Sequence, residues 1–146
     1  MKFFSAVVAA IALATSASAA FSSCGSSTDD FQLSSVTYTP NPPVVGQSVC
    51  ITIQGTLSTP VTQGATIHVT ATFWGINVYD QTSDLCAGLA GGATPCPIAT
   101  TVGNVTDCIT VPSNVPAGVQ INLQATANNA GGERLFCIAG PLTFSS

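Results

Sequence analysis

Short stretches of alternating apolar and polar residues recur along this chain. The clearest covers residues 66–74, where apolar residues alternate with threonines and one histidine. Another begins at Gln47, directly after a proline-rich connection at residues 40–46. Prolines cannot donate to a central ladder, so that connection should lie outside any sheet. A period of two is typical of a strand with one apolar face.

The same pattern predicts strands at residues 31–39, 47–55, 66–74, 76–79, 105–111, 119–127 and 134–144. Turn-forming residues separate these stretches, and no segment shows a helical period over three turns. Residues 80–101 contain several glycines and prolines and are predicted to lack regular structure. About seven short strands punctuated by turns predict an all-β fold, a β-sandwich of two antiparallel sheets.

The apolar faces of these strands form the candidate interior. Its members are Val49, Ile51, Ile53, Ile67, Val69, Ala71, Phe73, Ile76, Val78, Val119, Ile121, Leu123 and Leu135. By pattern alone they would make an ordinary solid core. Small residues such as Ala71 and Ala125 leave room among them, but they do not by themselves predict a cavity.

Residues 1–20 have the features of a secretory signal peptide, namely a basic start, an apolar run and small residues before a cleavage point. Residues 21–146 are then expected to form one domain, long enough to bury about two thirds of its unfolded surface. No later stretch reaches the roughly 18 apolar residues that a membrane span needs. We expect a soluble protein that is secreted or held in a secretory-pathway lumen such as the vacuole.

Charge is scarce in this chain, at 5% of residues against about 25% in an ordinary soluble domain. Once the leader is removed, Arg134 is the only basic residue against six acidic ones. This balance argues against a nucleic-acid partner. It also argues against docking on anionic lipid through a basic patch.

Six cysteines in an exported domain predict three disulfides, and spacing alone leaves fifteen pairings open. Cys50 and Cys108 both fall on polar faces, so we expect them to bridge neighbouring strands of one sheet. Cys24 and Cys137 would then tie the start of the domain to its last strand. A local bridge between Cys86 and Cys96 would stabilise a loop that is predicted to lack regular structure of its own.

The sequence offers little for catalysis or metal binding. No Cys-x-x-Cys pair occurs, and His68 is the only imidazole, so neither a metal nor a cofactor is expected. No Gly-x-Ser-x-Gly elbow nominates a nucleophile, and an enzyme is not expected. His68 and three aspartates, Asp80, Asp84 and Asp107, are interpreted as exposed surface groups.

Three further residues are singled out by their type or their surroundings. Asn104 begins the one glycosylation sequon, Asn-Val-Thr, and is a candidate glycan acceptor. Trp74 and Tyr79 flank a break in the pattern at Gly75. They are candidates either for a cavity mouth that meets a membrane or for ordinary packing.

Four motifs in this order resemble the ML family of lipid-recognition domains. They are Thr-Pro-Asn-Pro-Pro-Val-Val-Gly-Gln at 39–47, Asp-Leu-Cys at 84–86 with Pro-Cys-Pro-Ile at 95–98, Val-Pro-Ser-Asn-Val-Pro-Ala-Gly at 111–118, and Leu-Phe-Cys at 135–137. The resemblance covers nearly all of residues 21–146. The chain departs from the family in its Cys50 and Cys108 and in its lack of charged residues.

The resemblance implies an immunoglobulin-like sandwich whose sheets part to hold a lipid, with no enzymatic step. It implies the pairs Cys24 with Cys137 and Cys86 with Cys96, and it turns the candidate interior into a candidate cavity lining. The implied function is binding and transfer of a phospholipid (phosphatidylglycerol or phosphatidylinositol) or a sterol by a monomer that touches membranes transiently. The alternative is an extracellular recognition module with a solid core, and a lipid or glycan hydrolase is a weaker third hypothesis.

Overall fold

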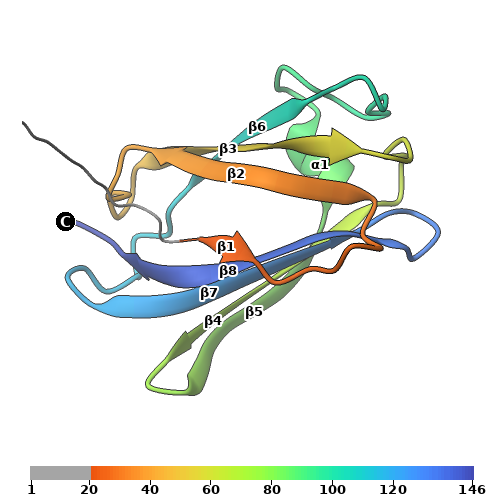
Figure 1. Ribbon diagram of the computed structural model, residues 1–146. Helices are drawn as coiled ribbons and strands as arrows, with labels where there is room; N and C mark the ends of the chain where they lie inside the picture. The colour runs from red at the N-terminus through yellow and green to blue at the C-terminus, as the bar shows by residue number, and fades with distance from the viewer. Residues whose placement is uncertain (1–20) are drawn as a thin grey trace, which may run out of the picture.

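The computed structural model describes residues 21–146; the expected signal peptide lies outside them. The described chain is built almost entirely of strands (Figure 1). In order they are β1 (Ser22–Ser23), β2 (Phe31–Thr39), β3 (Ser48–Leu57), β4 (Thr66–Phe73), β5 (Ile76–Asp84), the short helix α1 (Leu85–Leu89), β6 (Asn104–Thr110), β7 (Gln120–Asn128) and β8 (Arg134–Thr143).

The strands form two layers, as the alternating pattern predicts. One sheet has the order β1-β8-β7-β4-β5 and the other the order β2-β3-β6, and every neighbouring pair is antiparallel. Figure 1 shows the three-stranded sheet above the five-stranded one, with α1 at the end where β5 leads toward β6. The predicted β-sandwich is therefore confirmed.

The sequence-based prediction fails mainly at residues 80–101, which it expects to lack regular structure. β5 continues to Asp84 in register with β4, and α1 follows at once. The Asp84 side chain caps this helix by accepting a hydrogen bond from the backbone N–H of Ala87, at 2.9 Å. β5 has no apolar alternation after Tyr79 because it is an edge strand that is exposed along its whole length.

The two sheets approach each other along one side only. β2 runs close to β8 and β1 there, and the backbone N–H of Asp30 donates to the carbonyl of Arg134 at 3.0 Å. The Cys24–Cys137 disulfide ties the start of the domain to β8 on the same side. On the other side, β5 and β6 are the free edges of their sheets. The sandwich is closed along β1, β2 and β8.

The other two disulfides also join the expected partners. Cys50 and Cys108 are directly opposite each other on β3 and β6, on the face that points away from the other sheet. Cys86 and Cys96 fasten α1 to the loop that follows it. Among residues 21–146, no helix is long and apolar enough to span a bilayer.

The buried side chains gather into two separate clusters at the two ends of the sandwich. The α1-end cluster contains Phe31, Leu57, Val61, Ala65, Cys86, Leu89, Ile98, Ala127, Leu135 and Phe136. The hairpin-end cluster contains Val49, Ala71, Val111, Ile121, Leu142 and Phe144. Burial is therefore concentrated at the ends, and the middle of the sandwich has a different character.

Candidate functional site

Between the two clusters lies a central band of inward-facing apolar side chains: Val36, Ile51, Val69 and Ala125. The strand register fixes their direction, because Val69 is opposite Ala125 and lies between inward-facing neighbours on β4. None of the four belongs to either cluster, and all are only partly buried. Mid-strand apolar residues on the inner face of a solid sandwich would be fully buried. These four side chains therefore remain partly accessible in the middle of the sandwich, where a solid core would bury them.

The band opens toward the free edges of the two sheets, β5 and β6, which we call the open edge. On β5, Tyr79 and Gln81 face inward because they are opposite Ala71 and Val69 of β4. Both are exposed, since the three-stranded sheet does not reach over β5. On β6, Ile109 is opposite the buried Val49 yet remains 49% exposed. Solvent therefore reaches the inward faces of both strands.

The residues predicted from the sequence to line the interior are divided among these regions. Val49, Ala71, Ile121 and Leu135 are fully buried in the end clusters, and Ile53, Ile67, Phe73 and Leu123 pack partly buried against them. Ile51 and Val69 belong to the central band. Val119 is half-buried just before β7, whereas Ile76 and Val78 are 67% and 57% exposed on β5.

Asp107 is the one acidic residue that faces the inside of the sandwich. It is opposite Ile51 on β3, and on β6 it lies between the inward-facing Val105 and Ile109. Burial raises the pKa of Asp107, and the backbone N–H of Cys108 offsets part of that rise by hydrogen bonding to the carboxylate. The prediction of a solvated surface charge is therefore wrong. Its neighbour Cys108 points outward to its disulfide, which leaves residue 107 pointing inward.

The β4–β5 hairpin ends in an exposed aromatic tip. Trp74 has φ 53° and Gly75 has φ 76°, so both adopt the left-handed conformation of a tight hairpin turn. The Trp74 side chain is 84% exposed and meets the Phe73 ring edge to face at 6.0 Å. A shallow, open depression of about 560 Å³ lies beside it, lined by Phe73, Trp74, Gly118, Val119 and Gln120.

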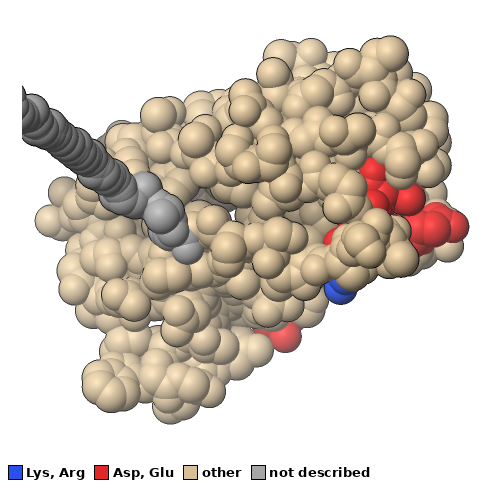
Figure 2. Space-filling view, viewed as in Figure 1, with Lys and Arg blue, Asp and Glu red and all other residues tan. Residues whose placement is uncertain are grey.

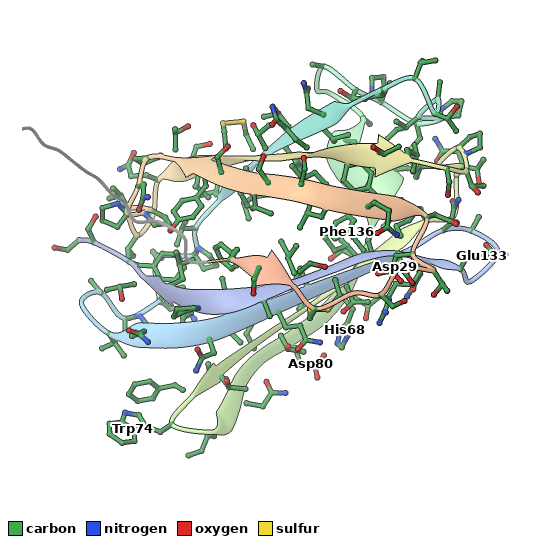
Figure 3. All side chains as sticks on the ribbon, viewed as in Figure 1. Asp29, His68, Trp74, Asp80, Glu133 and Phe136 are labelled. Atoms are coloured by element: carbon green, nitrogen blue, oxygen red, sulfur yellow. A yellow bond between two sulfur atoms is a disulfide. The ribbon has the colours of Figure 1, made fainter. Side chains whose placement is uncertain are left out.

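Charged side chains lie away from this tip. Asp29 and Glu133 are at the opposite end of the molecule from Trp74 (Figure 3). The end that carries the hairpin shows no acidic or basic side chain on the face seen in Figure 2. Ile76, Val78 and Tyr79 add to the exposed apolar surface beside Trp74. On this face, the hairpin end is therefore partly apolar and shows no charged side chain, whereas the opposite end carries Asp29 and Glu133.

The described residues contain one salt bridge, between Arg134 and Asp29, and one close contact between His68 and Asp80. Arg134 Nε donates to the buried Asp29 at 2.9 Å, and the backbone N–H of Ser26 donates to the same carboxylate at 3.1 Å. Burial alone would raise the pKa of Asp29, but these hydrogen bonds hold it below its usual value. His68 and Asp80 lie 2.6 Å apart on the outer face of the five-stranded sheet. The hydrogen bond to His68 is the main cause that lowers the pKa of Asp80.

Within residues 21–146, no three His, Cys, Asp or Glu side chains come together as they would around a metal ion. The central band consists of hydrocarbon side chains, which bind apolar ligands and do not activate water or transfer protons. What the arrangement offers chemically is an apolar space with one carboxylate at its edge.

Comparison with known proteins gives a consistent result. The family model described as ML domain matches residues 18–144. The chain is 32% identical over 112 residues to a phosphatidylglycerol/phosphatidylinositol transfer protein of Candida albicans, covering 77% of this chain and 58% of that protein. It is 30% identical over 110 residues to the protein of that name from Aspergillus oryzae, covering 75% and 62%. The chain thus spans about six tenths of the length of these relatives.

A solved structure has the same fold. The crystal structure of a Niemann-Pick type C2 protein from the Japanese carpenter ant superimposes with a TM-score of 0.63 at 16% sequence identity, covering 86% of this chain and 98% of that one. At this identity the likeness concerns the fold alone. The family model covers most of the chain, and the four sequence motifs and the two-sheet architecture agree with it, so the chain belongs to the ML domain family.

Proposed function

We propose that this protein binds the apolar part of a lipid in its central band and carries that lipid between membranes. The observation that carries the proposal is the pair of buried end clusters separated by apolar residues in mid-sheet that are only partly buried. Such a surface is costly to leave wetted, because apolar side chains gain about 25 cal/mol for each Å² removed from water. An acyl chain or a sterol ring lying across Val36, Ile51, Val69 and Ala125 would cover them.

The energetics suit carriage rather than chemistry. Each methylene transferred from water to an apolar site gains about 0.8 kcal/mol, so a lipid would seldom escape into water. A bilayer solvates the same chain equally well, and exchange between protein and membrane is then nearly isoenergetic. No bond is made or broken, and the proposed function includes no enzymatic step. The names of the curated relatives favour phosphatidylglycerol and phosphatidylinositol over a sterol as the cargo.

Lipid exchange needs contact with a membrane, and we assign that contact to the hairpin end. Trp74 and its exposed neighbours Ile76 and Val78 form an apolar tip with an indole that suits the interfacial region of a bilayer. The open edge begins at the same hairpin, since β5 starts at Ile76. A lipid could then pass between bilayer and central band without crossing bulk water.

The proposal includes an oxidising location and a monomeric state. Three disulfides favour the extracellular space or a secretory lumen over the cytosol. Asn104, the candidate glycan acceptor, is exposed at the start of β6 and would be accessible to the glycosylation machinery. A single chain contains the whole central band, so no second copy is needed to complete it.

A vesicle assay tests the proposal. Donor vesicles carry a self-quenched fluorescent phosphatidylglycerol or a fluorescent sterol, and unlabelled phosphatidylcholine vesicles serve as acceptors. The expected result is a dequenching rate that rises in proportion to protein concentration, with the disulfide-reduced and unfolded protein as control. A rate equal to spontaneous transfer for both lipids, across the whole range of protein concentration, would contradict the proposed function.

A further inference from the structure

The open edge is almost free of charge, and Asp107 is its exception. Its position on β6 places the carboxylate on the inner face of the three-stranded sheet, opposite Ile51 of the central band. Oδ2 of Asp107 also lies beside α1, 3.6 Å from the point where a Cβ on Gly88 would be. The carboxylate of Asp107 therefore lies between the central band and α1.

This carboxylate has few partners within the protein. An ionised carboxylate offers about four acceptor sites, and the backbone N–H of Cys108 occupies one. The pKa of Asp107 is raised because burial destabilises the ionised carboxylate more than this single hydrogen bond stabilises it. The group is underbonded at the place where a ligand in the central band would have its polar end.

No cation in the described chain is available to neutralise Asp107. Arg134, the only basic residue of 21–146, is paired with Asp29 on the closed side of the sandwich. His68 is paired with Asp80 on the outer face, and it points away from the interior. The neighbours of Asp107 on the inner face, Val105 and Ile109, are hydrocarbon. Compensating hydrogen bonds must come from water or from the ligand.

We propose that Asp107 determines lipid specificity at the open edge: it favours a lipid whose polar end donates a hydrogen bond to the carboxylate, and disfavours one that presents only acceptor oxygens there. The donor is a hydroxyl of a polyol head group, an ammonium N–H, or a sterol hydroxyl. A hydrogen bond to a charged group strengthens binding more than a neutral one, and an unprotonated phosphate oxygen in the same place would be repelled. This inference rests on the proposed function.

The test uses pairs of lipids in which one member has a hydrogen-bond donor at its polar end and the other lacks it. Phosphatidylglycerol is compared with phosphatidylethanol, phosphatidylethanolamine with phosphatidylcholine, and a sterol with its methyl ether, each as a competitor against one bound fluorescent lipid. For the disulfide-intact protein we expect the donor member of at least one pair to bind about five- to tenfold more tightly. The pair that shows the preference identifies the source of the donor.

Variants at the site make the result specific. Asp107→Leu should bring the ratio in that pair close to one, because the acceptor is gone. Asp107→Asn keeps a neutral acceptor, so the ratio should fall only in part, while phosphatidylethanol should bind more tightly once the negative charge is removed. Glu133→Gln removes an exposed charge from the β7–β8 turn at the end opposite the hairpin, and it should leave every ratio unchanged.

The outcomes separate the inference from the proposed function. Lipid binding by the unmodified protein without preference in any pair, or a preference that survives in Asp107→Leu, would overturn the role of Asp107 and leave lipid carriage intact. Failure of the unmodified protein to bind any of the lipids would overturn both. If Asp107→Leu does not fold, as judged by its thermal unfolding, the ratios of Asp107→Asn decide.

Discussion

Replacing Ala125 with leucine should stabilise the lipid-free protein and weaken lipid binding. Ala125 lies in the central band on β7, opposite Val69 of β4 and Ile138 of β8, and is only partly buried. Leucine adds three carbons at a position that the sheets bury only in part. In a solid core the same change would overpack the interior, which typically costs about 1–3 kcal/mol.

The magnitude follows from the added carbons. At about 0.8 kcal/mol each, three carbons would contribute roughly 2.4 kcal/mol if fully buried. Because the site is only partly buried, we expect a gain of about 1 kcal/mol in the free energy of unfolding, or about 3–5 °C in Tm. The same three carbons displace part of the ligand, so lipid affinity should fall about 10- to 50-fold.

Ala127 provides the matched control. It lies two residues farther along the same face of β7, opposite Ile67 and Phe136, and its exposure is 0% within the α1-end cluster. Ala127→Leu should destabilise the protein by about 1–3 kcal/mol. Strand propensity and composition change identically in the two variants, so the comparison isolates the free space. Thermal unfolding of delipidated protein measures both. If Ala125→Leu destabilises as much as Ala127→Leu, the middle of the sandwich is solid and the reasoning is refuted.

Three further predictions test the ends of the molecule and its pH response. Trp74 is the only tryptophan in the chain, so its emission should shift to the blue when phosphatidylcholine vesicles are added. Trp74→Ser should slow lipid transfer several-fold with little change in Tm, because the side chain is 84% exposed. Unchanged emission at saturating lipid would refute docking through the tip. Because the pKa of Asp29 is lowered in the folded protein, its contribution to stability is present above the unfolded pKa and is lost as pH falls through the lower folded value. Asp29→Asn should therefore reduce the free energy of unfolding at pH 7 by about 1–3 kcal/mol and flatten the dependence of that free energy on pH below 4. Equal acid sensitivity of the two proteins in denaturant titrations would contradict this. Replacing both Cys86 and Cys96 with alanine should lower the free energy of unfolding by about 2–3 kcal/mol, since the bridge closes a short loop and Cys86 is buried in the α1-end cluster. A loss below about 0.5 kcal/mol in denaturant titrations would show that packing alone holds α1.

Most of the fold follows from the sequence because strand periodicity is a local signal. Val49 to Ile53 and Ile67 to Phe73 alternate strictly, and the structure places both stretches in strands with those residues inward. The disulfide between Cys50 and Cys108 could also be anticipated, since both cysteines lie on polar faces. Periodicity predicts only the first four residues of β5, because an edge strand that the opposite sheet does not cover needs no apolar face.

The candidate site is harder to predict because it depends on the separation of the sheets. Alternation shows that Val49 and Ile51 face inward, but it cannot distinguish the partly buried Ile51 of the central band from the fully buried Val49 of the hairpin-end cluster. Its charge favours a surface position for Asp107, whereas the structure buries it in part. The neighbouring cysteine indicates the opposite: Cys108 faces outward, so Asp107, the residue before it in the strand, should face inward. The same register argument that placed the disulfide would have placed the carboxylate inside.

The central claim is that one lipid occupies the space between the sheets, and native mass spectrometry of the secreted protein tests it most directly. The intact protein is weighed under native conditions and then denatured in the same run with its disulfides preserved, so that any released molecule is identified by mass. The account predicts an excess equal to one phospholipid or one sterol per chain, which is lost on denaturation and much reduced in Ala125→Leu. Bare protein, persisting after incubation with mixed phospholipid and sterol vesicles, would contradict it.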